Sequence, residues 1–207
     1  QAGVPEEDWP ELIDCFMDWT DAGDEHRLNG AEESDAYYKE QGYEPKNAPL
    51  DTVDELMLIK GFTPAIVYGG PPPDPKSEPL KGIAHLLTTF GDGKVNVNTA
   101  SREVLMTLTA DNGKMMDEWV VDDILKYRGG DDGLPNTKDD GFESVQEAIS
   151  KTGMDPSLAG KISVADRQFV RVTSIGENNG VESGVWAIFE VGDRKVTPIY
   201  WREEQMQ

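Results

Sequence analysis

Apolar residues near the start of the chain recur with the period of an α-helix. Trp9, Leu12, Ile13, Phe16 and Trp19 would share one face of a helix, with polar residues between them. This spacing predicts an amphipathic helix over residues 8–19 with one buried face.

Two stretches of the chain share a pattern of helix boundaries. Residues 50–55 and 142–147 each open with an apolar residue, then Thr or Ser with Glu three positions later, which is a capping box. Each stretch continues to a Gly and then to a capped helix with Pro at its first position. We interpret them as an internal repeat of a helix-turn-helix unit rather than as two capping boxes that match by chance.

Residues 95–105 combine a short strand with a helix start. Apolar and amide residues alternate over residues 95–98, and Asn98 or Thr99 could cap a helix that begins near Ala100. This start signal is typical of small helical modules of the SAM-like or helix-hairpin-helix type. In some proteins such modules grip a nucleic-acid backbone, and in others they serve only as packing units.

The pattern changes to that of strands near the C-terminus. Residues 168–175, 185–191 and 196–202 are rich in β-branched and aromatic residues, with turn residues between them. They predict a three-stranded antiparallel meander whose apolar face needs a cover, usually a helix. The chain offers one short helix for this before its acidic zone, so we expect a longer N-terminal helix before Gln1.

Composition narrows the functional classes. The chain has 207 residues, enough for one large or two small domains, and its formal net charge is −21. Such a surface repels nucleic acid, because binding depends on phosphates being neutralised by Lys and Arg. The hairpin positions 61–63 and 111–113 also lack the Gly-x-Gly pattern with basic flanks. No apolar run approaches the roughly 20 residues that span a bilayer.

Catalysis finds little support in the sequence. The only imidazoles are His26 and His85, and neither has a Ser or Cys nucleophile in a recognisable local frame. Cys15 lies on the predicted first helix and is interpreted as a small core residue. We therefore expect no enzymatic activity and assign no catalytic residue.

Two acidic loops have the composition of calcium sites. Calcium takes six to eight oxygen ligands from carboxylates, amides and main-chain carbonyls. Residues 18–35 and 131–141 are rich in Asp, Asn and Gly, although neither matches the EF-hand spacing. Acidic surface without a metal is the alternative in a chain of this charge. The candidate ligands of the second loop are Asp131, Asp132, Asn136, Thr137, Asp139 and Asp140.

The combined motifs resemble those of a known family. Residues 18–21, 27–32 and 37–38 are followed in the same order by residues 45–47, 52–56, 60–61 and 95–100. This series resembles general secretion pathway protein K, the large minor pseudopilin of bacterial type II secretion. Residues 95–105 alone also resemble a competence-type helix-hairpin-helix DNA receptor, which supplies the alternative function of nucleic-acid binding.

The resemblance implies an α+β fold, a pilin-like antiparallel β-sheet with a large SAM-like (helix-hairpin-helix type) all-α insertion. On this basis residues 1–17 form an N-terminal helical segment that packs with the pilin-like part. Residues 18–160 form the inserted domain with both acidic loops, and residues 161–207 form the β-meander. Two departures are the pilin helix, which is expected before Gln1 and is not among these residues, and residues 131–141, which look like an insertion.

The resemblance also implies a structural role at the tip of the type II secretion pseudopilus, where the protein helps initiate assembly and secretion of folded proteins across the outer membrane. The expected partners are other minor pseudopilins in a hetero-oligomeric tip complex, with the secretin and secreted substrates as further candidates and no nucleic acid. The expected location is the periplasmic side of the inner membrane, reached through a single N-terminal helix. One or two calcium ions are expected, and the first ligand candidates are Asp18, Asp21, Asp24, Glu32 and Asp35.

Overall fold

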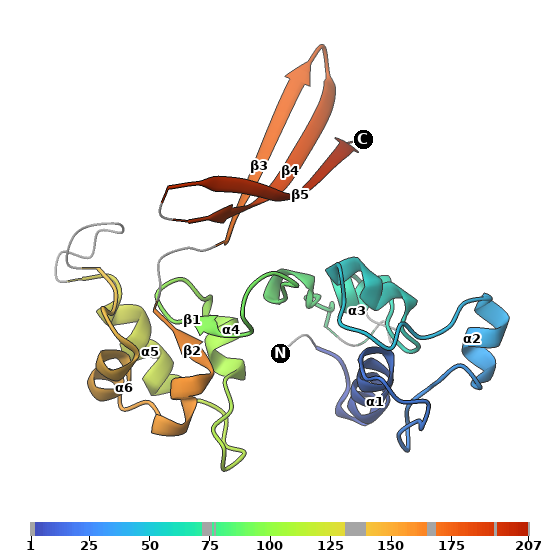
Figure 1. Cartoon of the computed structure of the whole chain (residues 1–207), viewed down its shortest axis with the longest axis horizontal. Helices are drawn as coiled ribbons and strands as arrows, with labels where there is room; N and C mark the ends of the chain where they lie inside the picture. The colour runs from blue at the N-terminus through green and yellow to red at the C-terminus, as the bar shows by residue number, and fades with distance from the viewer. Residues whose placement is uncertain are drawn as a thin grey trace. The chain divides into compact units, whose positions relative to one another are not determined.

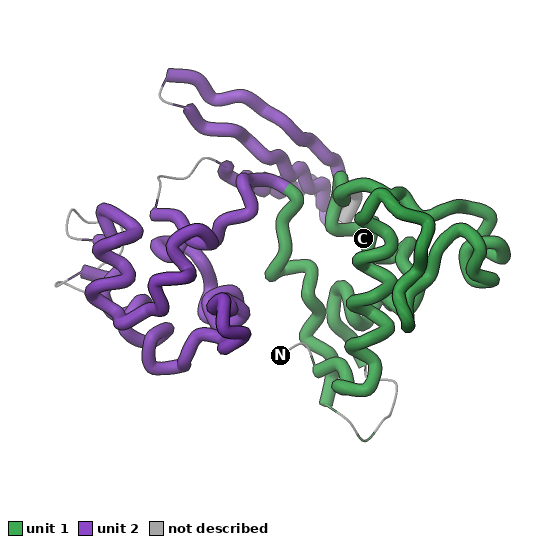
Figure 2. The backbone as a smooth tube through the Cα atoms, turned by 60° about the horizontal axis from the view of Figure 1, so that its bottom comes forward, with its two compact units in different colours: residues 1–89 green, residues 90–207 purple. Residues whose placement is uncertain are grey.

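The chain forms two compact units, residues 1–89 and residues 90–207, drawn in green and purple in Figure 2. The computed structural model describes residues 3–71, 76, 78–130, 140–164, 169–192 and 194–206, without the side chains of 204–206. The division between the units falls inside residues 18–160, which the family resemblance assigns to a single inserted domain. Its physical basis is that the buried apolar residues of the helical parts form two separate clusters.

Unit 1 consists of short helices around a core that contains Cys15, Trp19, Tyr38 and Leu56. Its elements, with 3-10 helices marked η, are η1 (Glu6–Asp8), α1 (Trp9–Thr20), α2 (Ala36–Gln41), η2 (Val53–Leu58), α3 (Pro64–Tyr68) and η3 (Ala84–Leu86) (Figure 1). The helix predicted over residues 8–19 is confirmed as α1.

The expected single buried face of α1 is wrong in part. Trp19 is buried and Leu12 and Phe16 are half buried, but Trp9 is 43% exposed and Ile13 58% exposed. Periodicity identifies the apolar side of the helix, whereas the packing of the rest of unit 1 determines how much of that side is covered.

Both predicted capping patterns are present. In the first, the Glu55 carboxylate accepts a hydrogen bond from the backbone N–H of Thr52 at 3.0 Å. In the second, Ser144 Oγ accepts from the backbone N–H of Glu147 at 3.1 Å, and the Glu147 carboxylate accepts from the N–H of Glu143 at 2.8 Å. The two stretches therefore begin their helices in nearly the same way, although the first forms a 3-10 helix and the second an α-helix.

The similarity continues beyond these two helices. Gly61 and Gly153 follow them with φ angles of +89° and +69°, a conformation that glycine adopts without strain. Thr63 then caps α3 and Asp155 caps η4, each by accepting a backbone N–H hydrogen bond. The geometry on both sides of each turn agrees with the proposed repeat.

Unit 2 begins with a second helical part. Its elements are β1 (Val95–Asn96), α4 (Arg102–Thr107), α5 (Glu118–Tyr127), α6 (Val145–Thr152), η4 (Pro156–Gly160) and β2 (Ile162–Ser163). β1 and β2 pair in parallel, and Ile162 belongs to the same core cluster as Val97, Leu105 and Ile124. Ile162, placed by its sequence position in the predicted C-terminal part, thus packs with the helical part.

The predicted helix start in residues 95–105 needs a correction. The helix α4 begins at Arg102, and its cap is Ser101, whose side chain accepts from the N–H of Val104. Neither Asn98 nor Thr99 is the N-cap. The reason is that residues 97–100 form a turn of their own, closed by hydrogen bonds from the N–H groups of Thr99 and Ala100 to Asn96 O.

The predicted C-terminal meander is confirmed. Strands β3 (Phe169–Asn178), β4 (Val181–Val191) and β5 (Val196–Met206) form an antiparallel sheet in the order β3-β4-β5 (Figure 1). Asn179 and Gly180, with φ angles of +52° and +78°, make the two-residue turn between β3 and β4. Helices combined with an antiparallel sheet confirm the mixed α+β class. No helix among the described residues has the length and apolar character needed to cross a bilayer.

Candidate functional site

The first acidic loop follows α1 and is tied back to that helix. Asp14 Oδ2 accepts hydrogen bonds from the backbone N and the side-chain Nδ2 of Asn29, at 3.1 and 2.9 Å. The Cys15 thiol donates to the carbonyl of Asn29 at 3.5 Å. Two adjacent helix residues, Asp14 and Cys15, therefore tie Asn29 of the loop back to α1.

Asp18 is the most deeply placed of the sequence-predicted ligands, with none of its surface exposed. Its carboxylate accepts hydrogen bonds from the backbone N–H of Arg27, and its Oδ1 lies 2.6 Å from Arg27 Nη1. The same Nη1 lies 2.5 Å from Asp21 Oδ2. One guanidinium is thus shared by two carboxylates, so the positive charge of Arg27 compensates only part of the negative charge of Asp18 and Asp21.

Arg27 also affects the ionisation of its partners. Its hydrogen bond to Asp21 lowers the pKa of that carboxyl below its ordinary value, and the N–H of Gly23 contributes in the same direction. In turn, the hydrogen bonds from Asp21 and Asp18 raise the pKa of Arg27. Both shifts favour the charged forms of Asp21 and Arg27.

Glu32 is the exception in this loop. Its side chain is 2% exposed, and its Oε1 has no hydrogen-bond partner among the described residues. Its pKa is raised from 4.5 to about 7, first by burial and then by the charges of Asp18, Asp21 and Asp24. A buried carboxylate without a counter-charge is unfavourable, so the site favours either a bound proton or an added cation.

The remaining two candidates of the first loop differ from one another. Asp24 is exposed and acts on Glu32 by its charge. Asp35 caps α2 by accepting from the N–H of Tyr37 at 2.8 Å, and its Oδ2 lies 3.1 Å from Lys60 Nζ. The Tyr37 hydrogen bond lowers the pKa of Asp35. Asp35 therefore already has both a cap and a cation as partners.

The arrangement does not form a ready metal site. No three His, Cys, Asp or Glu side chains within the described ranges lie close enough together to hold an ion. In the first loop, the guanidinium of Arg27 takes the position of the positive charge between Asp18 and Asp21. The residues fit calcium only if the ion displaces this guanidinium, and the unpartnered oxygen of Glu32 is the one observation that favours an additional cation.

The second acidic loop lies almost entirely outside the described residues. Five of its candidates do so: Asp131, Asp132, Asn136, Thr137 and Asp139. Asp140 is described and is half buried. The calcium prediction for this loop stays a prediction based on composition.

The residues considered for catalysis have ordinary structural settings. Cys15 is fully buried, and its burial raises the pKa of the thiol to about 12, so it stays protonated at neutral pH. This agrees with its interpretation as a core residue. His26 is exposed, and its Nδ1 lies 2.9 Å from the backbone carbonyl of Arg27.

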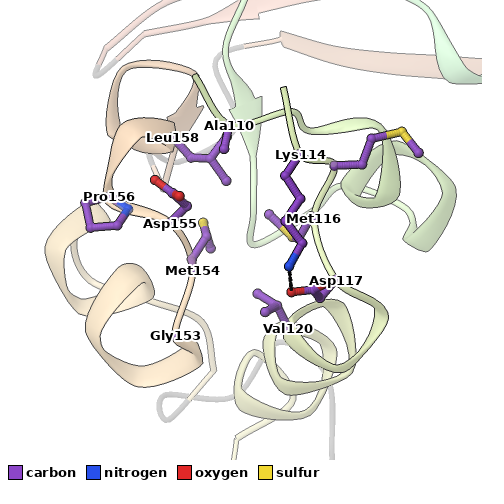
Figure 3. A pocket seen from close by; sticks show the side chains of 11 residues that line it. Ala110, Lys114, Met116, Asp117, Val120, Gly153, Met154, Asp155, Pro156 and Leu158 are labelled. Carbon is purple, nitrogen blue, oxygen red and sulfur yellow. Dashed lines mark hydrogen bonds and ion pairs between the residues drawn. The ribbon is translucent and has the colours of Figure 1, made fainter. Parts of the chain in front are cut away.

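A pocket in unit 2 lies beside the second copy of the repeat (Figure 3). Its volume is about 350 Å³, and its lining includes Met116, Met154 and Val120. The charges at its edge have partners, since Lys114 Nζ lies 2.7 Å from the Asp117 carboxylate. Lys161 Nζ likewise lies 2.9 Å from Asp111 in the neighbouring turn. Both lysines near the 111–113 turn are therefore neutralised by carboxylates, which disfavours phosphate binding there.

Comparisons with known proteins identify relatives of this chain. Residues 1–68 match the family described as type II secretion system, protein K. The whole fold is similar to a chain in the crystal structure of the GspK-GspI-GspJ complex from the enterotoxigenic Escherichia coli type 2 secretion system. Residues 1–68 therefore resemble protein K in sequence, and the chain as a whole resembles it in fold.

The fold match covers 98% of this chain and 66% of the other chain, with a TM-score of 0.66 and 15% sequence identity. This chain thus spans about two thirds of the length of that relative. No curated protein matches it in sequence. The family match includes the whole first acidic loop, so the loop between α1 and α2 is part of the shared region.

Sequence reasoning missed two residues of the acidic loop. Arg27 was seen only as part of a family motif, although it is the cation that joins Asp18 and Asp21. Gly30 was not singled out, yet a Cβ at this position would overlap the Asp18 carboxylate. The isolated basic residue in an acidic segment was an available signal for Arg27, whereas the close approach at Gly30 depends on the folded loop.

Proposed function

We propose that this protein is a structural minor pseudopilin of a bacterial type II secretion system, located at the tip of the pseudopilus. The observation that carries the proposal is the agreement of two comparisons: residues 1–68 match the protein K family, and nearly the whole chain matches the fold of a protein K chain. In this role the protein helps to initiate pseudopilus assembly and the secretion of folded proteins, without catalysing a reaction.

The β-sheet supports a role in assembly. Val172, Ala187 and Trp201 lie directly opposite one another across β3, β4 and β5. Val172 is 46% exposed and Trp201 is 60% exposed, whereas Ala187 between them is buried, so the outer strands present apolar surface to solvent. An exposed apolar sheet face needs a cover, which a pilin-type N-terminal helix or a neighbouring pseudopilin would provide.

The helical parts support the position at the tip. A pseudopilus grows by repeating one heterologous contact between successive subunits. Among the described residues before the pilin-like sheet, the elements are short helices and two two-residue strands. Such an addition would obstruct the next subunit, so the protein suits the end of the filament. The SAM-like character of this addition belongs to the proposal.

Location and partners follow from the same proposal. The described part is in the periplasm and is attached to the inner membrane by an N-terminal helix. The solved relative is named in a complex with GspI and GspJ. We propose that the corresponding minor pseudopilins of the same bacterium are the partners of this chain, with the secretin and secreted substrates as later contacts.

Calcium is a second part of the proposal. The ion would replace the Arg27 guanidinium as the counter-charge of Asp18 and Asp21, and Glu32 would supply a further oxygen. Its unpartnered, buried carboxylate supports this, because a divalent cation would convert the repulsion among these acids into attraction.

Co-purification tests the assembly role. The full-length protein should form a stable complex when expressed with the two corresponding minor pseudopilins, detected by size-exclusion chromatography with light scattering. Deletion of its gene should stop secretion of folded substrates into the medium, and the intact gene should restore it. Failure to form the complex together with normal secretion would contradict the proposal.

The sheet offers a matched pair of variants for this test. Val172→Ser with Trp201→Ser alters one face, whereas Ile175→Ser, at a residue that is 57% exposed, alters the other face of the same sheet. We expect only the first variant to weaken the complex or the stability of the full-length protein. Equal effects of the two would show that this apolar face has no specific partner.

A further inference from the structure

Helix α1 presents an uncovered apolar ridge. Trp9, Ile13 and Met17 lie at positions i, i+4 and i+8 and are 43%, 58% and 41% exposed. Isolated exposed apolar residues are ordinary on protein surfaces. Three in a row on one helix form a ridge of the kind that packs against another helix.

The ridge borders a groove within unit 1. Phe16, Phe62 and Ile66 contribute to its lining, and Leu87, 46% exposed, lies in the lining as well. The groove has a volume of about 390 Å³ and a lining that is almost wholly apolar. Its volume lies within the range of roughly 300 to 1,000 Å³ that binding pockets occupy. The Trp9 ring is fixed beside it, since Nε1 donates to the carbonyl of Val4 at 3.0 Å.

Acidic side chains accompany the ridge. They are the three residues of η1, Glu6, Glu7 and Asp8, and Glu11 in the first turn of α1. All four are exposed. Within the described part of the chain, none of the four forms an ion pair. Lys60 interacts with Glu11 through its charge, but its ion pair is with Asp35. The rim along α1 is therefore strongly negative.

We propose that this groove binds an amphipathic helix of a partner protein, with an apolar face for the ridge and a Lys- and Arg-rich polar face for the rim. The spacing of Trp9, Ile13 and Met17 selects a helix, because helix-in-groove recognition uses anchors at this period. The acidic rim selects basic flanks. A second copy of this chain does not fit, since it would bring two acidic rims together in molecules with a formal net charge of −21.

The proposal does not depend on the role in secretion, because it rests on unit 1 alone. Its first test uses the full chain and a fluorescent amphipathic peptide made of leucine and lysine. Two control peptides are needed, one with the same residues in scrambled order and one with glutamate in place of lysine. Fluorescence anisotropy should show saturable binding of the amphipathic basic peptide, with affinity at least about tenfold higher than for either control.

Variants place the binding in the groove. Ile13→Ser with Met17→Ser should lower the affinity about tenfold or more, since both side chains are anchors. Leu28→Ser is the matched control in the same unit, because Leu28 is 94% exposed and does not line the groove. Glu7→Gln with Glu11→Gln should weaken binding at low salt and reduce its salt dependence. Circular dichroism checks that every variant folds, which is expected because the altered side chains are exposed.

Each other outcome overturns the proposal. Equal binding of the amphipathic and scrambled peptides would reduce the effect to nonspecific attraction of cations. Equal binding of the glutamate peptide would show that the groove does not select a basic partner. Unchanged affinity of the Ile13 and Met17 variant would place the peptide elsewhere. A dimer of the chain that is lost in this variant would assign the groove to a second copy.

Discussion

The side-chain amide of Asn98 forms two hydrogen bonds with the backbone of Phe142. Asn98 Nδ2 donates to the Phe142 carbonyl at 3.0 Å, and Asn98 Oδ1 accepts from the Phe142 N–H at 2.8 Å. Nδ2 also lies 3.4 Å from the carbonyl of Val164. One side chain therefore links three segments that are far apart in the sequence, at the start of the second copy of the repeat.

Replacing this amide should destabilise unit 2. Asn98→Ala removes the partners of half-buried backbone groups, so we expect a loss of about 2 to 4 kcal/mol in the free energy of unfolding. Asn112→Ala is the matched control, because Asn112 is exposed and only accepts a turn hydrogen bond from the Lys114 N–H. Its cost should be about 1 kcal/mol or less. Urea unfolding measures both, and equal losses would contradict the role of Asn98.

Gly30 should be irreplaceable for a steric reason. Its backbone lies against Asp18, and a Cβ would overlap that carboxylate and disturb its bonds to Arg27. Gly30→Ala should therefore cost about 1 to 3 kcal/mol. Gly23→Ala in the same loop should be nearly neutral, because its nearest new contact would be Asp21 Oδ1 at an ordinary 3.6 Å. Thermal melts of the two variants measure the difference.

Glu32 should make stability depend on pH in a defined window. Its pKa is about 7 in the folded chain, compared with an ordinary value of 4.5 in the unfolded chain. Between these two pH values the folded state therefore holds a proton that the unfolded state has released. The stabilisation is present below about pH 4.5 and is lost as the pH rises through about 7. Glu32→Gln should remove this decline and be more stable than the unaltered protein above pH 7.

Glu33→Gln provides the control, since Glu33 is adjacent in sequence and exposed. Melting curves between pH 4 and pH 9, recorded with a chelator, separate this effect from metal binding. If the stability of Glu32→Gln falls with rising pH as much as that of the unaltered protein, the pH dependence comes from groups other than Glu32.

Calcium should raise the melting temperature and chelator should lower it. A ligand that binds only the folded state adds about 2.7 kcal/mol at a hundredfold excess over its dissociation constant. Magnesium should substitute poorly, because it requires a smaller, octahedral set of ligands. Calorimetric melts with each ion measure these shifts. A melting temperature that changes with neither calcium nor chelator would show that neither loop binds calcium.

Variants assign any calcium effect to a loop. Asp21→Ala with Asp24→Ala should abolish the share of the first loop, and Asp139→Ala with Asp140→Ala that of the second. Arg27→Gln should increase the response to calcium, because Asp18 and Asp21 lose the guanidinium that now neutralises them. A weaker response in Arg27→Gln would show that calcium and Arg27 do not compete.

The chain should not bind duplex DNA measurably at physiological salt. The reasons are its formal net charge of −21 and the pairing of Lys114 and Lys161 with carboxylates beside the 111–113 turn. An electrophoretic mobility assay at micromolar protein tests this. A salt-sensitive shift would favour the helix-hairpin-helix alternative over the secretion role.

The sequence by itself determined the features that depend on neighbouring residues. These features are the capping patterns at Thr52 and Ser144, the turn at Asn179–Gly180 and the helix α1. Each depends on residues only a few positions apart in the sequence. The family resemblance is of the same kind, because it depends on short motifs in a fixed order.

The tertiary structure alone decided how side chains are used. Asn98 looked like a helix cap and instead bonds to residues 44 and 66 positions away. Asp18 and Asp21, which the sequence predicts to be metal ligands, both form ion pairs with Arg27. Trp9 and Ile13 looked like core residues and remain exposed beside a groove. Local pattern fixes where a side chain points along its own element, but its partner comes from segments that only folding brings near.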